Sequence, residues 1–116
     1  MRNLQAYRSL LSEIAELLDK GRDQKYASSV RTALSGDEKT IEKFLVSNTL
    51  WGGAESIADS ALLGEGFVGF DRLATLRKRF TRLMADLGRL QLQDRKANPR
   101  TPTWLEVFEK SLADKR

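Results

Sequence analysis

The sequence predicts an all-α protein, folded as a compact bundle of five or six helices in a single domain that spans residues 1–116. Apolar residues recur at spacings of three and four along most of the chain, which is the periodicity of amphipathic helices. No segment shows convincing alternation of apolar and polar residues, as a half-buried strand would. A chain of 116 residues also suits one core of ordinary size, with too little material for two.

Two helices are expected in the first third of the chain, over about residues 2–20 and 23–34. The first ends at Gly21, a residue suited to the left-handed conformation that commonly follows a helix. The apolar face of the first helix comprises Leu4, Tyr7, Leu11, Ile14 and Leu18. The apolar face of the second helix comprises Tyr26, Val30, Ala33 and Leu34.

A third helix is expected after Asp37, which is a good N-cap residue, with Ile41 and Phe44 on its inner face. Residues 47–53 interrupt the periodicity, and a short helix is expected over roughly 54–63. Segment 64–70 contains three glycines and two phenylalanines, which predicts a loop whose aromatic side chains are held in the core or at a surface groove.

The longest helix is expected over about residues 71–96. Its apolar stripe repeats every three and four residues and consists of Leu73, Leu76, Phe80, Leu83, Leu87 and Leu90. The stripe has two interpretations: it forms the core of the bundle, which we favour, or it pairs with a second copy in a homodimer. A last helix opens either at Thr101-Pro102 or at Thr103, which has capping-box spacing to Glu106.

The sequence contains no cysteine and no histidine. It therefore lacks disulfides, thiolate nucleophiles, the commonest general base and the commonest zinc ligand. We expect no enzyme activity, no catalytic residues, no cofactor and no metal. No apolar run approaches the roughly 18 residues needed to cross a bilayer, and no export signal is visible, so we expect no membrane association and a cytoplasmic location.

Charge is concentrated on the longest predicted helix. Between residues 71 and 100 there are nine basic and three acidic residues, a net charge of +6 in a chain whose net charge is +4. This pattern suits an acidic protein surface or, as the second candidate, the phosphates of a nucleic acid; it also suits a plain solvated helix face. The candidate partner contacts on this helix are Arg77, Arg79, Arg82 and Arg89.

Two tryptophans are candidate aromatic anchors for a partner, if they are exposed: Trp51 and Trp104. Trp51 precedes Gly52-Gly53, whose backbone amides could hold an anion. We favour the simpler interpretation, in which Trp51 is buried beside a glycine-hinged turn. Acidic pairs such as Glu55 and Asp59 are interpreted as solvated helix faces rather than metal ligands or acid–base groups.

The segment from Tyr26 to Asp59 resembles an uncharacterised family of small bacterial all-helical proteins. The matching residues are Tyr26, Leu34, Gly36-Asp37, Phe44-Leu45, Gly52-Gly53, Ser56 and Asp59. The chain departs from the family pattern after the glycines, with Ala54-Glu55 where that pattern has Met-Gly. The resemblance implies an immunity-type role.

We therefore expect a small, non-enzymatic protein-binding module of the immunity or inhibitor type, which occludes a partner protein such as a bacterial toxin. Two alternatives stay open. One is a nucleic-acid-associated protein that uses the basic long helix. The other is a helical scaffold subunit of a larger assembly, which self-association through the leucine stripe would favour.

Overall fold

The computed structural model describes residues 2–62 and 70–114, and within these residues the chain is helical without strands. The all-α prediction is confirmed. Five described helices have eight or more residues, and two are single turns. The helices are α1 (Leu4–Lys20), α2 (Gln24–Leu34), α3 (Glu38–Leu45), α4 (Asn48–Trp51), α5 (Ile57–Ser60), α6 (Phe70–Gln93) and α7 (Thr101–Ala113).

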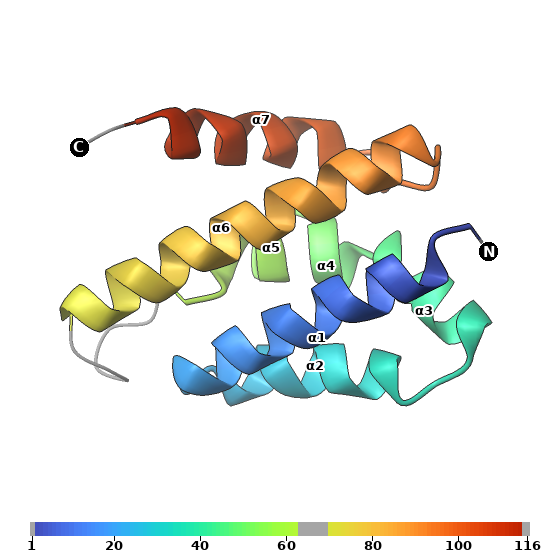
Figure 1. Cartoon of the computed structure of the whole chain (residues 1–116), viewed down its shortest axis with the longest axis horizontal. Coiled ribbons are helices and arrows are strands. Elements are labelled where there is room, and N and C mark those ends of the chain that lie inside the picture. The colour runs from blue at the N-terminus through green and yellow to red at the C-terminus, as the bar shows by residue number, and fades with distance from the viewer. Residues whose placement is uncertain (1, 63–69, 115–116) are drawn as a thin grey trace.

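Helix α6 lies between α1 and α7 (Figure 1), and the packing pairs α1–α2, α1–α6 and α6–α7 dominate the contacts between helices. α1 and α6 run in opposite directions (Figure 1). The short helices α3, α4 and α5 follow one another along the far side of this row. α6 is therefore covered by α1 along one edge and by α7 along the other, and a strip of its surface is left facing solvent.

The leucine stripe of α6 belongs to the core of the bundle, as we favoured. Leu76, Phe80 and Leu87 are buried, and the remaining members of the stripe are half-buried where α6 meets its neighbours. The helix ends at Gln93, three residues before the expected end at 96, because Arg95 adopts a left-handed backbone conformation (φ 57°) that turns the chain out of the helix.

The end of α1 differs from expectation in its backbone conformation. Gly21 has φ −84°, and the left-handed residue is Arg22, with φ 58°. Gly21 is instead required by packing, because a Cβ atom on it would lie 2.1 Å from Cδ2 of Leu62. The glycine was recognised as an end signal, but its physical role is close approach rather than backbone freedom.

Two predicted N-caps have different outcomes. Asp37 caps α3 as expected: its Oδ1 accepts a hydrogen bond from the backbone N–H of Thr40 at 2.9 Å. The capping box at Thr103 is wrong, because α7 begins two residues earlier, at Thr101, and Pro102 lies in its first turn. That start is the other of the two predicted for this helix, and Pro suits it because the first turn leaves N–H groups unpaired anyway.

The region after α3 was predicted least well. Instead of one helix over 54–63, the chain forms α4 and α5, each a single turn capped by a serine whose Oγ accepts a backbone hydrogen bond, Ser47 for α4 and Ser56 for α5. Glu55 and Leu62 have left-handed backbones, with φ 67° and 60°, and these limit the second turn. The predicted loop 64–70 lies outside the described residues, apart from Phe70, which begins α6.

Candidate protein-binding surface

Trp51 is the buried centre of the joint that fixes α6 against α3 and α4. Its side chain is 0% exposed, so the interpretation as a buried plug is confirmed and Trp51 offers no surface for a partner. The indole Nε1–H donates to Oε1 of Gln91, a residue of α6, over 2.8 Å. A buried indole needs such an acceptor, because leaving its N–H unpaired would cost free energy.

Gln91 completes this joint from inside α6. Its Nε2 donates to the backbone oxygens of Leu45 and Lys96, each at 2.8 Å. Together with the bond from Trp51, these hydrogen bonds connect Gln91 to three different parts of the chain. Gln91 was not among the residues predicted to be functional or structural. A signal was present, since Gln91 is four residues after Leu87 and eleven after Phe80, which places a polar side chain on the buried face of α6.

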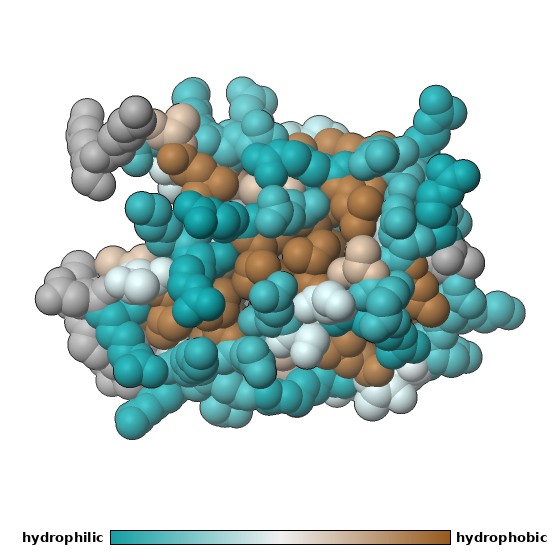
Figure 2. All heavy atoms as spheres, viewed as in Figure 1, coloured by the Kyte–Doolittle hydropathy of each residue, from teal (hydrophilic) through white to brown (hydrophobic). Residues whose placement is uncertain are grey.

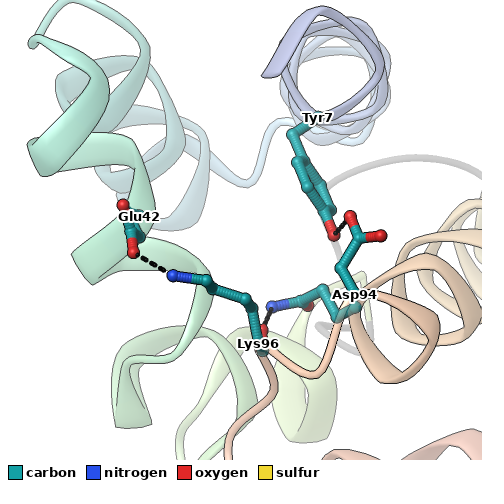
Figure 3. A network of polar contacts seen from close by, with 5 residues as sticks. Tyr7, Glu42, Asp94 and Lys96 are labelled. Carbon is teal, nitrogen blue, oxygen red and sulfur yellow. Dashed lines mark hydrogen bonds and ion pairs between the residues drawn. The ribbon is translucent and has the colours of Figure 1, made fainter. Parts of the chain in front are cut away.

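Two polar pairs tie the C-terminal end of α6 to α1 and α3 (Figure 3). Tyr7 donates its hydroxyl hydrogen to Asp94 over 2.8 Å, and Lys96 donates to Glu42 over 2.7 Å. Burial and the hydrogen bond to Asp94 raise the pKa of Tyr7 above its ordinary value, and hydrogen bonds from Asn3 and Tyr7 lower the pKa of Asp94. These contacts fix the position at which α6 crosses α1.

Trp104 holds α7 in place and is half-buried. Its Nε1–H donates to the backbone oxygen of Gly52 over 3.2 Å, and its ring stacks on Phe108 with the centroids 5.9 Å apart. Phe108 also contacts Trp51 and Phe80, with centroid distances of 6.4 and 6.5 Å. Trp104 thus keeps part of its surface exposed, but its polar atom is committed to the fold.

Arg77 is a structural residue rather than a free surface cation. Its Nη1 donates to the backbone oxygen of Ala61 over 2.6 Å, and its guanidinium lies over the ring of Phe80, 5.0 Å from the centroid. Burial lowers the pKa of Arg77 below its ordinary value. Of the four candidate arginines, this one is the least available to a partner.

Arg89 is exposed but already neutralised. It forms ion pairs with Asp86 on α6, at 3.0 Å, and with Glu109 on α7, at 3.5 Å. Exposed pairs of this kind contribute little to stability, about 0–1 kcal/mol. They nevertheless offset the positive charge of Arg89 locally, so this arginine adds little to a basic surface.

Arg79 and Arg82 are the two candidate arginines that remain available. Both are exposed, and neither side chain has an ion pair or hydrogen bond within the described ranges 2–62 and 70–114. They line a groove of about 220 Å³ between α1 and α6, which we call the α1/α6 groove. Its lining consists of Glu13, Glu16, Leu17, Lys20, Arg79, Arg82, Leu83 and Asp86.

Two of the other candidate groups, the amide of Gly52 and the carboxylate of Asp59, form hydrogen bonds within the fold. The amide of Gly52 donates to the backbone oxygen of Asn48 over 2.8 Å, which removes it as an anion ligand. Asp59 accepts hydrogen bonds from the amide of Glu55 and the hydroxyl of Ser60. In the part of the chain that the structure describes, no three His, Cys, Asp or Glu side chains are grouped so as to hold a metal ion.

Comparison with known proteins does not assign the chain to a family: no protein-family model, no curated protein and no solved structure matches it. Among the described helices, none is long and apolar enough to cross a bilayer.

Proposed function

We propose that this protein is a small, non-enzymatic binding module that occludes a partner protein, with Arg79 and Arg82 at the centre of its contact surface. The observation that carries the proposal is the availability of these two side chains. Both are exposed, both lack an ionic partner within the described part of the chain, and both line a groove together with Leu17 and Leu83. Arginine is one of the residues enriched among the contacts that dominate binding energy at protein interfaces.

The charges around the groove favour a protein over a nucleic acid. Glu13, Glu16 and Asp86 lie in the same groove as Arg79 and Arg82. These carboxylates would repel phosphates, whereas a protein surface can present opposite charges to both signs. The burial of Arg77 and the ion pairs of Arg89 further shorten the row of bases that a phosphate backbone could follow.

We place the protein in the immunity or inhibitor type, acting on a partner such as a bacterial toxin in the cytoplasm. Inhibition by occlusion requires only a rigid, complementary surface. The joint around Trp51 and Gln91 provides that rigidity, because it fixes α6 to α3 and α4 from inside the core. The half-exposed ring of Trp104 is a second contact candidate on α7.

Affinity capture from a lysate of the native host tests the proposal. The wild-type chain is compared with the double variant Arg79→Glu/Arg82→Glu, with and without nuclease, and bound proteins are identified by mass spectrometry. The matched control is Lys25→Glu/Lys39→Glu, which makes the same change in charge in the first turns of α2 and α3, where acids suit the helix dipole.

The proposal predicts one stoichiometric protein that survives nuclease, stays bound to the control variant and is lost from the Arg79/Arg82 variant. Once the partner is identified, its dissociation constant for the Arg79→Glu/Arg82→Glu variant should be about tenfold or more above the wild-type value, because like charges replace complementary ones. If this variant retains the partner at full affinity, Arg79 and Arg82 do not form the centre of the contact surface. Binding that disappears with nuclease, and weakens steeply with salt, would establish the nucleic-acid alternative instead.

A further inference from the structure

The two ends of the α1/α6 groove carry opposite charge. Helices α1 and α6 run antiparallel (Figure 1), and Tyr7 of α1 is hydrogen-bonded to Asp94 at the end of α6. Ten residues after Tyr7 and eleven before Asp94, Leu17 and Leu83 therefore lie at the same level along the two helices, in the middle of the groove lining. Glu13 and Asp86 therefore lie toward one end of the groove. Lys20 and Arg79 lie toward the other end, and all these residues line the groove together.

Most of these charges are not used inside the molecule. Glu13, Glu16, Lys20, Arg79 and Arg82 form no side-chain ion pair or hydrogen bond within residues 2–62 and 70–114. Five charged side chains thus line one groove with both signs present and no internal pairing. Such charges can be satisfied by another molecule that presents the opposite pattern.

A second copy of the same protein, related by a twofold rotation, presents this opposite pattern. We propose that the α1/α6 groove is a self-association surface, on which a second copy docks about a twofold axis that crosses α1 and α6 at Leu17 and Leu83. This axis places the acidic end of one copy on the basic end of the other. Glu13 then faces Lys20 of the second copy, and Asp86 faces Arg79 of the second copy.

The alternative twofold axis, parallel to the helices, is excluded by the same charges. It would place Glu13 against Asp86 of the second copy and Lys20 against Arg79 of the second copy, so that like charges meet at both ends. Like charges across an interface oppose association. The charge pattern therefore selects one orientation of a symmetric, self-complementary interface.

Apolar atoms are available at the centre of this interface. Figure 2 shows apolar side chains in the middle of the face on which α6 and α1 lie, surrounded by hydrophilic residues. Of the two leucines that line the groove, Leu83 is half-buried and Leu17 is buried. An apolar centre with a charged rim is the usual arrangement of a protein interface.

Self-association on this face would regulate the proposed partner-binding site, since it covers Arg79 together with the neighbouring Arg82. A second copy and a foreign partner would compete for the same groove. This regulatory role rests on the function proposed above, whereas the self-association itself is independent of it.

Two charge-swapped variants test the interface and its orientation. One is Glu13→Lys/Asp86→Lys, which makes both ends of the groove basic, and the other is Lys20→Glu/Arg79→Glu, which makes both ends acidic. Each variant alone meets its own like charges across the proposed axis. In a mixed dimer of the two variants all four ionic contacts are attractive again: two are the wild-type pairs and two have their signs reversed.

Sedimentation equilibrium at low salt over a wide concentration range provides the measurement, with Lys25→Glu/Lys39→Glu as the control. We expect a wild-type dimer that weakens with added salt, a dimer dissociation constant raised about tenfold or more in each swapped variant, and recovery to near the wild-type value in their mixture. The control should dimerise like the wild type.

A wild-type chain that stays monomeric at every concentration would overturn the proposal, as would a dimer that both variants preserve. A dimer lost in each variant but not recovered in the mixture would refute the proposed axis. None of these outcomes bears on the partner protein, which is tested separately by capture with the Arg79→Glu/Arg82→Glu variant. The two proposals can therefore fail independently.

Discussion

Replacing Gln91 by leucine tests whether the joint beneath α6 holds the bundle together. The leucine side chain is close in size to the glutamine side chain but carries no polar atoms. The substitution therefore leaves the indole N–H of Trp51 and the backbone oxygens of Leu45 and Lys96 without the amide that binds them.

The expected cost follows from these three hydrogen bonds. The bonds to Trp51 and Leu45 are buried, and the bond to Lys96 is partly buried. A buried polar group that loses its partner costs about 1–3 kcal/mol. Two such groups, with a smaller contribution from the third, give a loss of about 3–5 kcal/mol in the free energy of unfolding. Because typical domains have a stability of about 5–15 kcal/mol, this loss removes a large share of it, and the denaturation midpoint should fall substantially.

Urea denaturation followed by tryptophan fluorescence measures this loss, because Trp51 lies at the joint and Trp104 lies on the adjacent helix. The matched control is Gln93→Leu, the same substitution two residues later at an exposed position, which should change stability by no more than about 0.5 kcal/mol. If Gln91→Leu unfolds at the same urea concentration as the wild type, the three hydrogen bonds of Gln91 do not stabilise the fold.

Two further predictions concern residues that tie α6 to its neighbours. Tyr7→Phe should lower stability by about 1 kcal/mol at neutral pH. Burial and Asp94 raise the pKa of Tyr7 in the folded protein. The protonated phenol therefore stabilises the fold fully below its ordinary pKa of 10.0, and this stabilisation is lost as the pH rises above that value. In alkali, the denaturation midpoints of the wild type and of Tyr7→Phe should converge. Arg77→Ala should cost about 2 kcal/mol, through the lost hydrogen bond and the lost contact with Phe80, whereas Arg79→Ala should stay within about 0.5 kcal/mol of wild type in the same denaturation assay. Equal losses for the two arginines would refute the distinction between them.

Helices with strong periodicity were predictable from the sequence, and helices defined by side-chain caps were less so. The stripe from Leu73 to Leu90 identified α6 because burial on one face repeats with the helix period. The single turns α4 and α5 have no such stripe to reveal them. Each of them depends on one serine cap and on local backbone conformation, which periodicity does not report.

The candidate surface was predictable in composition but not in detail. A row of bases on a long helix is visible in any sequence, but its members differ in what lies beside them. Arg77 is held by Ala61, sixteen residues earlier in the chain, and Arg89 by Glu109 on another helix. Contacts between residues so far apart depend on how the helices pack. The sequence therefore could not show that Arg79 and Arg82 are the two left available.

The distribution of these arginines bears on how the surface would recognise a partner. If all the bases of α6 faced solvent, the helix would attract any acidic molecule, with long-range steering as the main effect. The fold holds Arg77 partly buried and offsets Arg89 with two carboxylates, so that of the four candidate arginines only Arg79 and Arg82 stay available, in the groove beside Leu83. There it is matched by Glu13, Glu16 and Asp86 on the same surface. A surface with both signs in a fixed arrangement selects its partner by register as well as by net charge, because a shifted partner meets like charges. Specific recognition of a protein surface is therefore a better use of α6 than general attraction to polyanions.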